Sequence, residues 1–323
     1  MLLANAAVST TMEVRMQRVR RNRPGGAIAA ALVTLGLVTT TGAAAANAST
    51  ARAASTTKAA STAAASAARA ASTTKAASTT IKVPTKYASG IKVAVDATYP
   101  PDEFIKKGKI VGFDADLAAA LGKVMGVKLH LVDATFDTII TGVEDGKYGM
   151  GNSSFTDTKE REKAVEFVDY FVAGEAFYEN ATSHRVFNGL KSLCGHSVSV
   201  ESGTTEQADA QSEAKHCKVN VESFANQDQA NLAVSDGRAD IGFADSQVAA
   251  YIVHLSHGQF KLTGKAFETA PYGFIVAKNS GLATPLLAAV KALIKDGQYV
   301  KILDKWGVQA GAIKTPRIDG ATS

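Results

Sequence analysis

The order of apolar segments constrains the fold of this chain most strongly. From Ile91 onward, short apolar runs the length of one strand alternate with helical patterns, several of which end at a glycine. Predicted strands cover 91–95, 127–132, 197–200, 219–221 and 240–243, and predicted helices cover 114–125, 135–144, 205–215 and 227–235. Such alternation forms mainly parallel sheets with helices on both faces. The sequence therefore predicts an α/β protein.

The two halves of this region share a short pattern, in which a helix ends at a glycine, a basic residue follows and a strand leads into polar residues. The matching residues, 91 positions apart, are Val143, Asp145, Gly146, Lys147 and Gly151 in the first copy and Val234, Asp236, Gly237, Arg238 and Gly242 in the second. Two similar lobes are predicted, with chance as the alternative, because Asp-Gly-Lys is an ordinary helix stop. Ligands of open α/β sheets collect beyond the carboxyl ends of the strands. The polar residues at 152–156 and 245–247 are therefore expected to face one cleft.

The N-terminal part of the chain has the pattern of a secretory signal. A basic stretch at 15–23 precedes an apolar run of 12 residues at 27–38, and small residues at 44–48 fit a cleavage site. The apolar run is shorter than the roughly 20 residues that span a membrane, although an uncleaved anchor is the alternative. We expect a signal peptide over 1–48, with no cysteine near the cleavage site to carry a lipid.

Residues 49–83 are predicted to be a disordered linker. This segment is almost entirely Ala, Ser and Thr with a few basic residues and repeats the hexapeptide AASTTK, so it has too little apolar surface to offset the entropy of ordering. Either a spacer through a cell wall or slack chain fits that composition. The first 82 residues hold ten basic residues and one acid, so residues 83–323 carry a net charge of −4. A mildly acidic globular part gives no electrostatic basis for nucleic-acid binding.

Cys194 and Cys217 are the only cysteines. In an exported protein such a pair is expected to close as a disulfide, and each of these cysteines shortly precedes a predicted strand. Their bond would tie the starts of two neighbouring strands. His254 and His257 lie close together but have no acidic or cysteine partners for a zinc-type site, so we expect neither a metal nor a cofactor.

Arg161 and Asp245 are the charged residues that the two polar segments would bring to the cleft. Arg161 follows Thr156, Asp157 and Thr158, which favour a helix start, so its guanidinium and the free backbone N–H groups there would suit a carboxylate. Asp245 follows the strand at 240–243. An α-amino acid could place its carboxylate on Arg161 and its ammonium on Asp245, and both pairs would form only when the cleft closes. The alternatives are an ion pair of Arg161 with a surface acid and a helix-capping role for Asp245.

Other side chains are expected around the same ligand. Ser154, Thr156, Thr204 and Thr205 would add neutral hydrogen bonds. Tyr99 and Phe136 would flank the ligand's side chain, unless they belong to the core. Asp96, just past the first strand, is the expected partner of a cationic or amide side chain.

A series of motifs resembles the extracellular polar amino-acid-binding proteins of ABC transporters, bacterial solute-binding protein family 3. They are DATYPP at 96–101, GFDADL at 112–117, FD at 136–137, SSFTDTKER at 153–161, GTTE at 203–206, GRAD at 237–240, AD at 244–245, DGQY at 296–299 and KWG at 305–307. Each motif is loose, but their order and spacing from about 91 to 307 are specific.

The resemblance implies a two-lobe type II periplasmic-binding-protein fold, with a mainly parallel sheet flanked by helices in each lobe and the ligand in the interlobe cleft. Lobe 1 would comprise 84–176 and 273–323, and lobe 2 would comprise 177–272. It also implies that Arg161 and Thr156 bind the ligand's carboxylate, Asp245 and Ser154 its ammonium, and Asp96 the polar end of its side chain. The chain departs from the family pattern at Asp102, Ser154 and Glu206, and an added acid at the pocket mouth would favour a basic ligand unless it points to solvent.

We therefore expect a secreted, monomeric, non-catalytic receptor that captures a polar, basic amino acid and delivers it to ABC transporter permease subunits. The sequence lacks the G-x-S-x-G, H-E-x-x-H, P-loop and G-x-G-x-x-G motifs. One alternative is a dehydratase of the same fold, and another is a ligand-binding sensor that feeds no transporter.

Overall fold

The computed structural model describes residues 81–322. The predicted signal peptide and nearly all of the predicted linker lie outside the described residues. Within 81–322, no helix combines the length and apolarity that a membrane span requires.

The main sheet has eight strands in the order β5-β1-β6-β11-β7-β10-β8-β9. Their bounds are β1 Ile91–Val95, β5 Leu129–Asp133, β6 Met150–Gly151, β7 Val165–Asn180, β8 Ser197–Glu201, β9 Asn220–Phe224, β10 Ile241–Asp245 and β11 Phe260–Ala277. A second, three-stranded antiparallel sheet consists of β2 Thr98–Tyr99, β3 Glu103–Lys106 and β4 Lys109–Val111.

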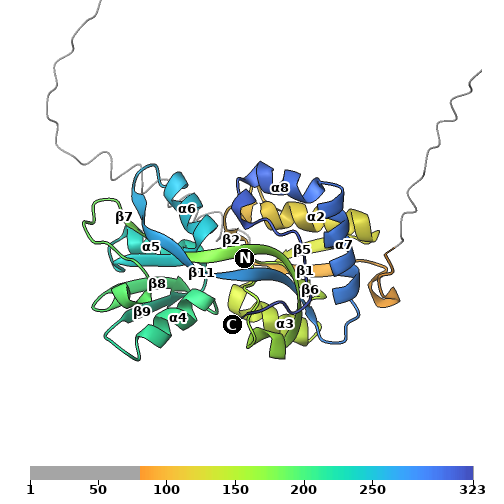
Figure 1. Cartoon of the computed structure of the whole chain (residues 1–323), viewed down its shortest axis with the longest axis horizontal. Helices are drawn as coiled ribbons and strands as arrows, with labels where there is room; N and C mark the ends of the chain where they lie inside the picture. Colours follow the sequence, from red (N-terminus) through yellow and green to blue (C-terminus); the bar gives the residue numbers. More distant parts are fainter. Residues whose placement is uncertain (1–80, 323) are drawn as a thin grey trace, which may run out of the picture. The chain divides into compact units, whose positions relative to one another are not determined.

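Two parallel strand groups flank a long antiparallel pair in the main sheet (Figure 1). Strand β1 pairs in parallel with β5 and β6, and β8 pairs in parallel with β9 and β10. Between these groups β7 and β11 pair with each other along most of their length. This arrangement confirms the predicted α/β class, although the sequence patterns did not predict β7 or β11. The predicted lobe boundaries fall within these two strands, and the division at those residues remains a prediction.

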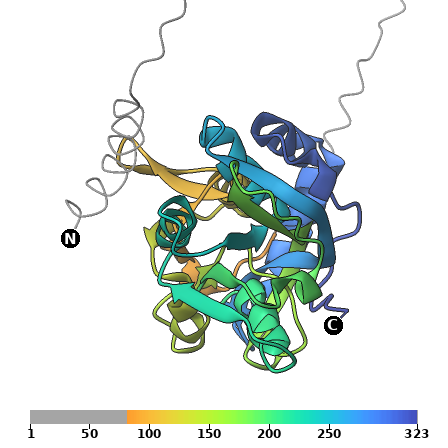
Figure 2. The same cartoon turned by 90° about the vertical axis from the view of Figure 1, so that its left-hand side faces the viewer.

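Helices cover both faces of the strands. They are α2 Phe113–Met125, α3 Ile139–Glu144, α4 Thr205–Glu213, α5 Gln227–Ser235, α6 Ser246–Leu255, α7 Ala283–Lys295 and α8 Gln298–Trp306. Helix α2 ends where Gly126 adopts a left-handed φ of 66°, as its sequence predicts. Helices α2, α7 and α8 pack together beside the first strand group (Figure 1). Figure 2 turns the end of the sheet that contains β8 and β9 toward the viewer.

The hydrophobic core is divided between the two strand groups. Leu117 and Leu286 belong to a cluster that packs α2 and α7 against the first group. Val198 and Phe243 belong to a separate cluster in the second group.

The predicted disulfide between Cys194 and Cys217 is present. It joins the segments that lead into β8 and β9, which lie next to each other in parallel register from Ser197 and Asn220 onward. The disulfide thus fixes the starts of two neighbouring strands at the end opposite their polar tips.

Candidate functional site

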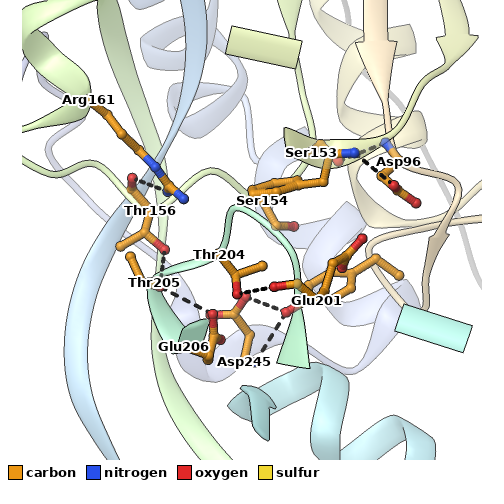
Figure 3. Close-up of a pocket in the computed structure, with 12 residues that line it drawn as sticks. Asp96, Ser153, Ser154, Thr156, Arg161, Glu201, Thr204, Thr205, Glu206 and Asp245 are labelled. Carbon is orange, nitrogen blue, oxygen red and sulfur yellow. Dashed lines mark hydrogen bonds between the residues drawn. The ribbon is translucent and has the colours of Figure 1, made fainter. Parts of the chain in front are cut away.

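One pocket gathers all nine predicted binding residues. It lies between the two strand groups (Figure 3). The predicted residues that line it are Asp96, Tyr99, Phe136, Ser154, Thr156, Arg161, Thr204, Thr205 and Asp245. Three further lining residues, Ser153, Glu201 and Glu206, were not among the predicted binding residues.

Strand ends explain why these residues meet. Asp96 directly follows β1, Ser153 follows β6 by two positions, Glu201 is the last residue of β8 and Asp245 is the last residue of β10. Because the strands within each group are parallel, the carboxyl ends of each group lie together, and residues at the ends of both groups line the same pocket. The backbone N–H of Asp96 donates to Ser153 Oγ at 2.9 Å, which ties the tips of β1 and β6 together.

Arg161 lies at one side of the pocket, held by two backbone carbonyls. Its Nη1 donates to the carbonyl oxygen of Thr156 and its Nη2 to that of Gly203, both at 2.8 Å. The guanidinium carbon lies 5.7 Å from the centre of the Phe136 ring. These contacts come from both strand groups. Among residues 81–322, Arg161 makes them and no ion pair with a surface acid, which was the alternative for this side chain.

The local structure at Arg161 differs from the predicted helix start. Residues Arg161–Lys163 form a single 3-10 turn, because β7 begins at Val165 and leaves no room for a helix. The backbone N–H of Arg161 is already bonded to Thr158 Oγ1 at 3.2 Å. The predicted contribution of free helix N–H groups is therefore wrong, and the guanidinium itself is what this turn offers to an anion.

Asp245 faces the pocket from the other strand group. It is 6% exposed, and its Oδ2 accepts a hydrogen bond of 2.7 Å from the hydroxyl of Tyr99. Helix α6 begins at the next residue, but the Asp245 side chain makes no capping bond, so the capping alternative is wrong. Burial raises the pKa of Asp245 to about 7, although the hydrogen bond from Tyr99 and the charge of Arg161 each act to lower it.

Three of the predicted hydroxyl residues, Thr156, Thr204 and Thr205, make hydrogen bonds at the wall of the pocket. Thr204 caps α4 by accepting from the backbone N–H of Gln207, and its own hydroxyl donates to the carbonyl oxygen of Glu201 at 2.8 Å. The hydroxyl oxygens of Thr156 and Thr205 lie 3.4 Å apart across the two strand groups. The contact between Thr156 and Thr205 thus links the two groups at the pocket.

Asp96 and Glu201 place carboxyl groups at the side of the pocket opposite Arg161 (Figure 3). Asp96 is 3% exposed and accepts from the Thr98 hydroxyl at 2.6 Å and from the backbone N–H of Phe136 at 3.0 Å. Burial raises its pKa to about 6. Burial, followed by repulsion from Asp96, raises the pKa of Glu201 well above its ordinary value. Its position at the end of an apolar strand, like that of Asp245, is the signal that could have identified Glu201.

The two predicted aromatic residues have partners of their own. The Phe136 ring stacks on Phe155, with ring centres 4.5 Å apart, and the Tyr99 hydroxyl is bonded to Asp245. Both rings line the pocket and are more than 90% buried, so they belong to the core and to the pocket wall at once. Their flanking of a ligand side chain stays a prediction.

Asp102 does not lie at the pocket mouth. It is fully buried, accepts from Ser154 Oγ and Gln247 Nε2 at 2.8 Å each, and does not line the pocket. The expectation of an added acid at the mouth is thus wrong for this residue. Ser154 adopts a left-handed φ of 49°, a conformation that favours glycine, the residue that the family pattern has at this position.

The pocket is acidic overall. Four carboxyl groups, those of Asp96, Glu201, Glu206 and Asp245, share its wall with one guanidinium. Burial raises the pKa of Glu206 to about 8, and the charge of Asp245 adds to the shift. A cation placed among these groups would favour their ionised forms. The arrangement therefore suits a ligand with one negative group and more than one positive group.

No metal-binding set is found near this pocket among the described residues. Within 81–322, the side-chain donors close enough to share an ion are those of Cys194, Glu213 and Cys217. Both of these cysteines are closed in the disulfide, so they offer no thiolate.

Comparison with known proteins places this pocket in a family. The family model for bacterial extracellular solute-binding proteins, family 3, matches residues 91–309. The chain belongs to this family. The match confirms the resemblance drawn from the motifs, and it covers every residue that lines the pocket.

Two relatives of this family 3 protein bear on its ligand. The arginine-binding protein ArgT of Corynebacterium glutamicum is 32% identical over 223 residues, which are 67% of this chain and 73% of the relative. The structure of an ancestral arginine-binding protein bound to arginine is similar at a TM-score of 0.66 and 35% identity, over 68% of this chain and 99% of that one.

A third relative bears on catalysis. It is the ancestral amino acid-binding protein AncCDT-1, a precursor of cyclohexadienyl dehydratase, with a TM-score of 0.63 and 34% identity over 68% of this chain and 95% of that one. These solved relatives confirm the two-lobe, type II periplasmic-binding fold that the sequence predicts.

Proposed function

We propose that this family 3 protein captures a basic amino acid, arginine above all, between its two lobes outside the cell and delivers it to the permease of an ABC transporter. The observation that carries the proposal is the charge pattern of the pocket. One guanidinium lies on one side and four carboxyl groups line the rest of the wall. That pattern complements one carboxylate and two cations, which are the charges of arginine and lysine.

Binding would place each charged end of the ligand on a side chain of opposite sign. Arg161 would pair with the α-carboxylate, because its planar fork of donors matches a carboxylate. Asp245, held in position by the Tyr99 hydroxyl, would accept the α-ammonium. Arg161 precedes β7 and Asp245 ends β10, so a ligand bound to both would draw the two strand groups together.

The names of relatives support the same ligand class. ArgT of Corynebacterium glutamicum and the ancestral protein bound to arginine are both called arginine-binding. The pocket of this chain is acidic in the way that a basic ligand requires. The two lines of support are independent, since the pocket's charge is found without reference to the relatives.

The same proposal includes the organisation of the whole protein. Residues 1–48 would be a signal peptide and 49–83 a linker, so that the receptor works as a secreted or wall-associated monomer. Lobe 1 would comprise 84–176 and 273–323, and lobe 2 would comprise 177–272, with the crossings inside β7 and β11. Delivery would require contact with permease subunits, and a sensor without a permease is the alternative.

We propose further that the protein is not an enzyme. Its relatives are named as binding proteins, although one of them is a precursor of cyclohexadienyl dehydratase. A dehydratase is the second candidate because the chain is similar to this precursor and because Arg161 would bind the carboxylate of a cyclic acid in the same way. Purified protein mixed with prephenate or arogenate should yield no aromatic product, as followed by absorbance. Turnover would contradict the receptor function and show that the protein is an enzyme.

A thermal-shift screen tests the proposed function. The protein is unfolded and refolded to remove carried-over ligand and is then heated with each amino acid in turn. Basic amino acids should raise the melting temperature most, because a ligand that binds the native state stabilises it by an amount that grows with the logarithm of its concentration over Kd. A screen in which neutral or acidic amino acids give the largest shift would contradict the proposal.

A further inference from the structure

Glu201 is a buried carboxyl group that the carboxylate and ammonium contacts of an amino acid leave unused. It ends β8, it is 2% exposed, and it lines the pocket. Its Oε1 atom is buried and has no hydrogen-bond partner among residues 81–322. Burying such an oxygen without a partner costs free energy that an apolar side chain at the same position would avoid. A donor supplied by a ligand would satisfy it.

Asp96 lies on the same side of the pocket as Glu201, away from Arg161 (Figure 3). Both carboxyl groups line the same pocket, and burial, followed by repulsion from Asp96, raises the pKa of Glu201 well above its ordinary value. Asp96 follows β1 in one strand group, and Glu201 ends β8 in the other. The two carboxyl groups therefore approach each other from the two halves of the sheet, just as Arg161 and Asp245 do.

We propose that Glu201 determines specificity by forming, with Asp96, a two-carboxylate receptor for the cationic end of the ligand's side chain. This inference rests on the proposed function and extends it to the choice of side chain. Figure 3 shows Asp96 and Glu201 on the side of the pocket away from Arg161, where the far end of a bound amino acid would lie. A cation there neutralises both carboxylates and supplies a donor to Glu201 Oε1. A ligand with a neutral side chain leaves the Asp96 and Glu201 carboxylates unneutralised, so that they either repel each other or must share a proton.

The matched ligand pair for a test is arginine and citrulline. Citrulline has the same length, but a neutral urea group replaces the guanidinium, so the pair isolates the charge of the side chain. Isothermal titration calorimetry of the refolded protein should show tighter binding of arginine than of citrulline. In Glu201→Gln the arginine affinity should fall about 10- to 100-fold, the range for a lost charge-assisted hydrogen bond, while the citrulline affinity changes about threefold or less.

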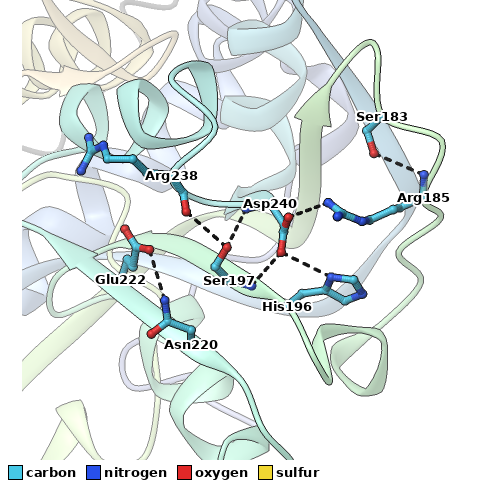
Figure 4. Close-up of polar contacts among 8 residues, drawn as sticks. All are labelled: Ser183, Arg185, His196, Ser197, Asn220, Glu222, Arg238 and Asp240. Carbon is cyan, nitrogen blue, oxygen red and sulfur yellow. Dashed lines mark hydrogen bonds and ion pairs between the residues drawn. The ribbon is translucent and has the colours of Figure 1, made fainter.

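Glu222→Gln is the control variant. Glu222 lies on β9, in the same strand group, where it accepts a hydrogen bond from Asn220 away from the pocket (Figure 4). This substitution removes the same charge and should leave the ratio of the arginine and citrulline affinities unchanged. If Glu201→Gln lowers the arginine and citrulline affinities equally, so that their ratio is unchanged, the proposed role of Glu201 is overturned.

Two further measurements keep the inference testable. If Glu201→Gln fails to fold by circular dichroism, a crystal structure of the wild-type protein with arginine decides, because the guanidinium should lie within hydrogen-bond distance of both Asp96 and Glu201. A guanidinium away from Glu201 would overturn the inference while leaving the proposed function intact. If the wild-type protein binds no amino acid, the proposed function fails and the inference fails with it.

Discussion

The hydroxyl of Tyr99 donates a 2.7 Å hydrogen bond to the carboxyl group of Asp245, a residue 146 positions further along the chain. The backbone N–H of Asp245 donates back to the Tyr99 oxygen at 3.2 Å. Strand β2 carries Tyr99 and strand β10 carries Asp245, so this reciprocal pair joins the two sides of the pocket. It also fixes the orientation of the carboxyl group that is proposed to receive the ligand's ammonium.

Substitution Tyr99→Phe should therefore weaken amino-acid binding. It removes a hydrogen bond to a charged group and leaves the ring in place, so the affinity should fall about tenfold. Tyr178→Phe is the control, because the Tyr178 hydroxyl is buried against Asn231 and does not line the pocket. Calorimetry should show a lower affinity for Tyr99→Phe alone, and equal affinities in the two variants would contradict the orienting role.

Arg161→Ala should abolish measurable binding. The substitution leaves the ligand's carboxylate without its charged partner inside the pocket, a loss of at least about 100-fold in affinity. Arg185→Ala removes an arginine from a half-exposed ion pair with Asp240 outside the pocket (Figure 4) and should leave the affinity unchanged. Retained binding in Arg161→Ala would show that another group holds the carboxylate.

The stability of the protein without ligand should fall as the pH rises from about 5 to 8. Burial raises the pKa to about 6 for Asp96, about 7 for Asp245 and about 8 for Glu206. Ordinary carboxyl groups titrate near 4, so above that pH the folded protein holds protons that the unfolded chain releases. The stabilisation from these protons is complete below about pH 4 and is lost as the pH passes through the raised values.

Urea denaturation at pH 5 and pH 8 checks this dependence. The midpoint should be lower at pH 8, and Glu206→Gln should reduce the difference. Added arginine should restore stability more at pH 8 than at pH 5, because the ionised carboxylates bind the cation. A midpoint that rises between pH 5 and pH 8 in the absence of ligand would be incompatible with the buried acidic wall.

Removal of the disulfide should lower stability without changing ligand affinity. Cys194 and Cys217 are 23 positions apart, and closing a loop of that size stabilises a folded chain by roughly 3 kcal/mol. Neither cysteine lines the pocket. The double variant Cys194→Ser, Cys217→Ser should denature at a lower urea concentration than the wild type and bind arginine with the same affinity by calorimetry. A large loss of affinity in the folded variant would connect the disulfide to the site.

Strand ends made most of the pocket predictable from the sequence. Asp96 and Asp245 each stand where an apolar run stops, and the carboxyl ends of parallel strands meet at one edge whatever the details of packing. Glu201 occupies the same kind of position and could have been identified by the same rule. Its unpartnered oxygen and its closeness to Asp96 depend on the approach of two strand groups, which no local pattern encodes.

Other features depend on contacts between distant residues. Asp102 is buried, and its donors Ser154 and Gln247 lie 52 and 145 positions away along the chain. Strands β7 and β11 extend over 16 and 18 residues through their mutual pairing, and their apolar patterns do not alternate regularly. The turn at Arg161 is short because β7 begins directly after it. Each of these features is set by tertiary structure, so the local sequence could not predict it.

A crystal structure of the refolded protein with arginine tests the central claim most directly. The claim predicts the α-carboxylate on the Arg161 guanidinium, the α-ammonium on the Asp245 carboxylate and the guanidinium of the ligand beside Asp96. An arginine bound with its carboxylate away from Arg161, or with Arg161 and Asp245 both engaged elsewhere, would contradict the account.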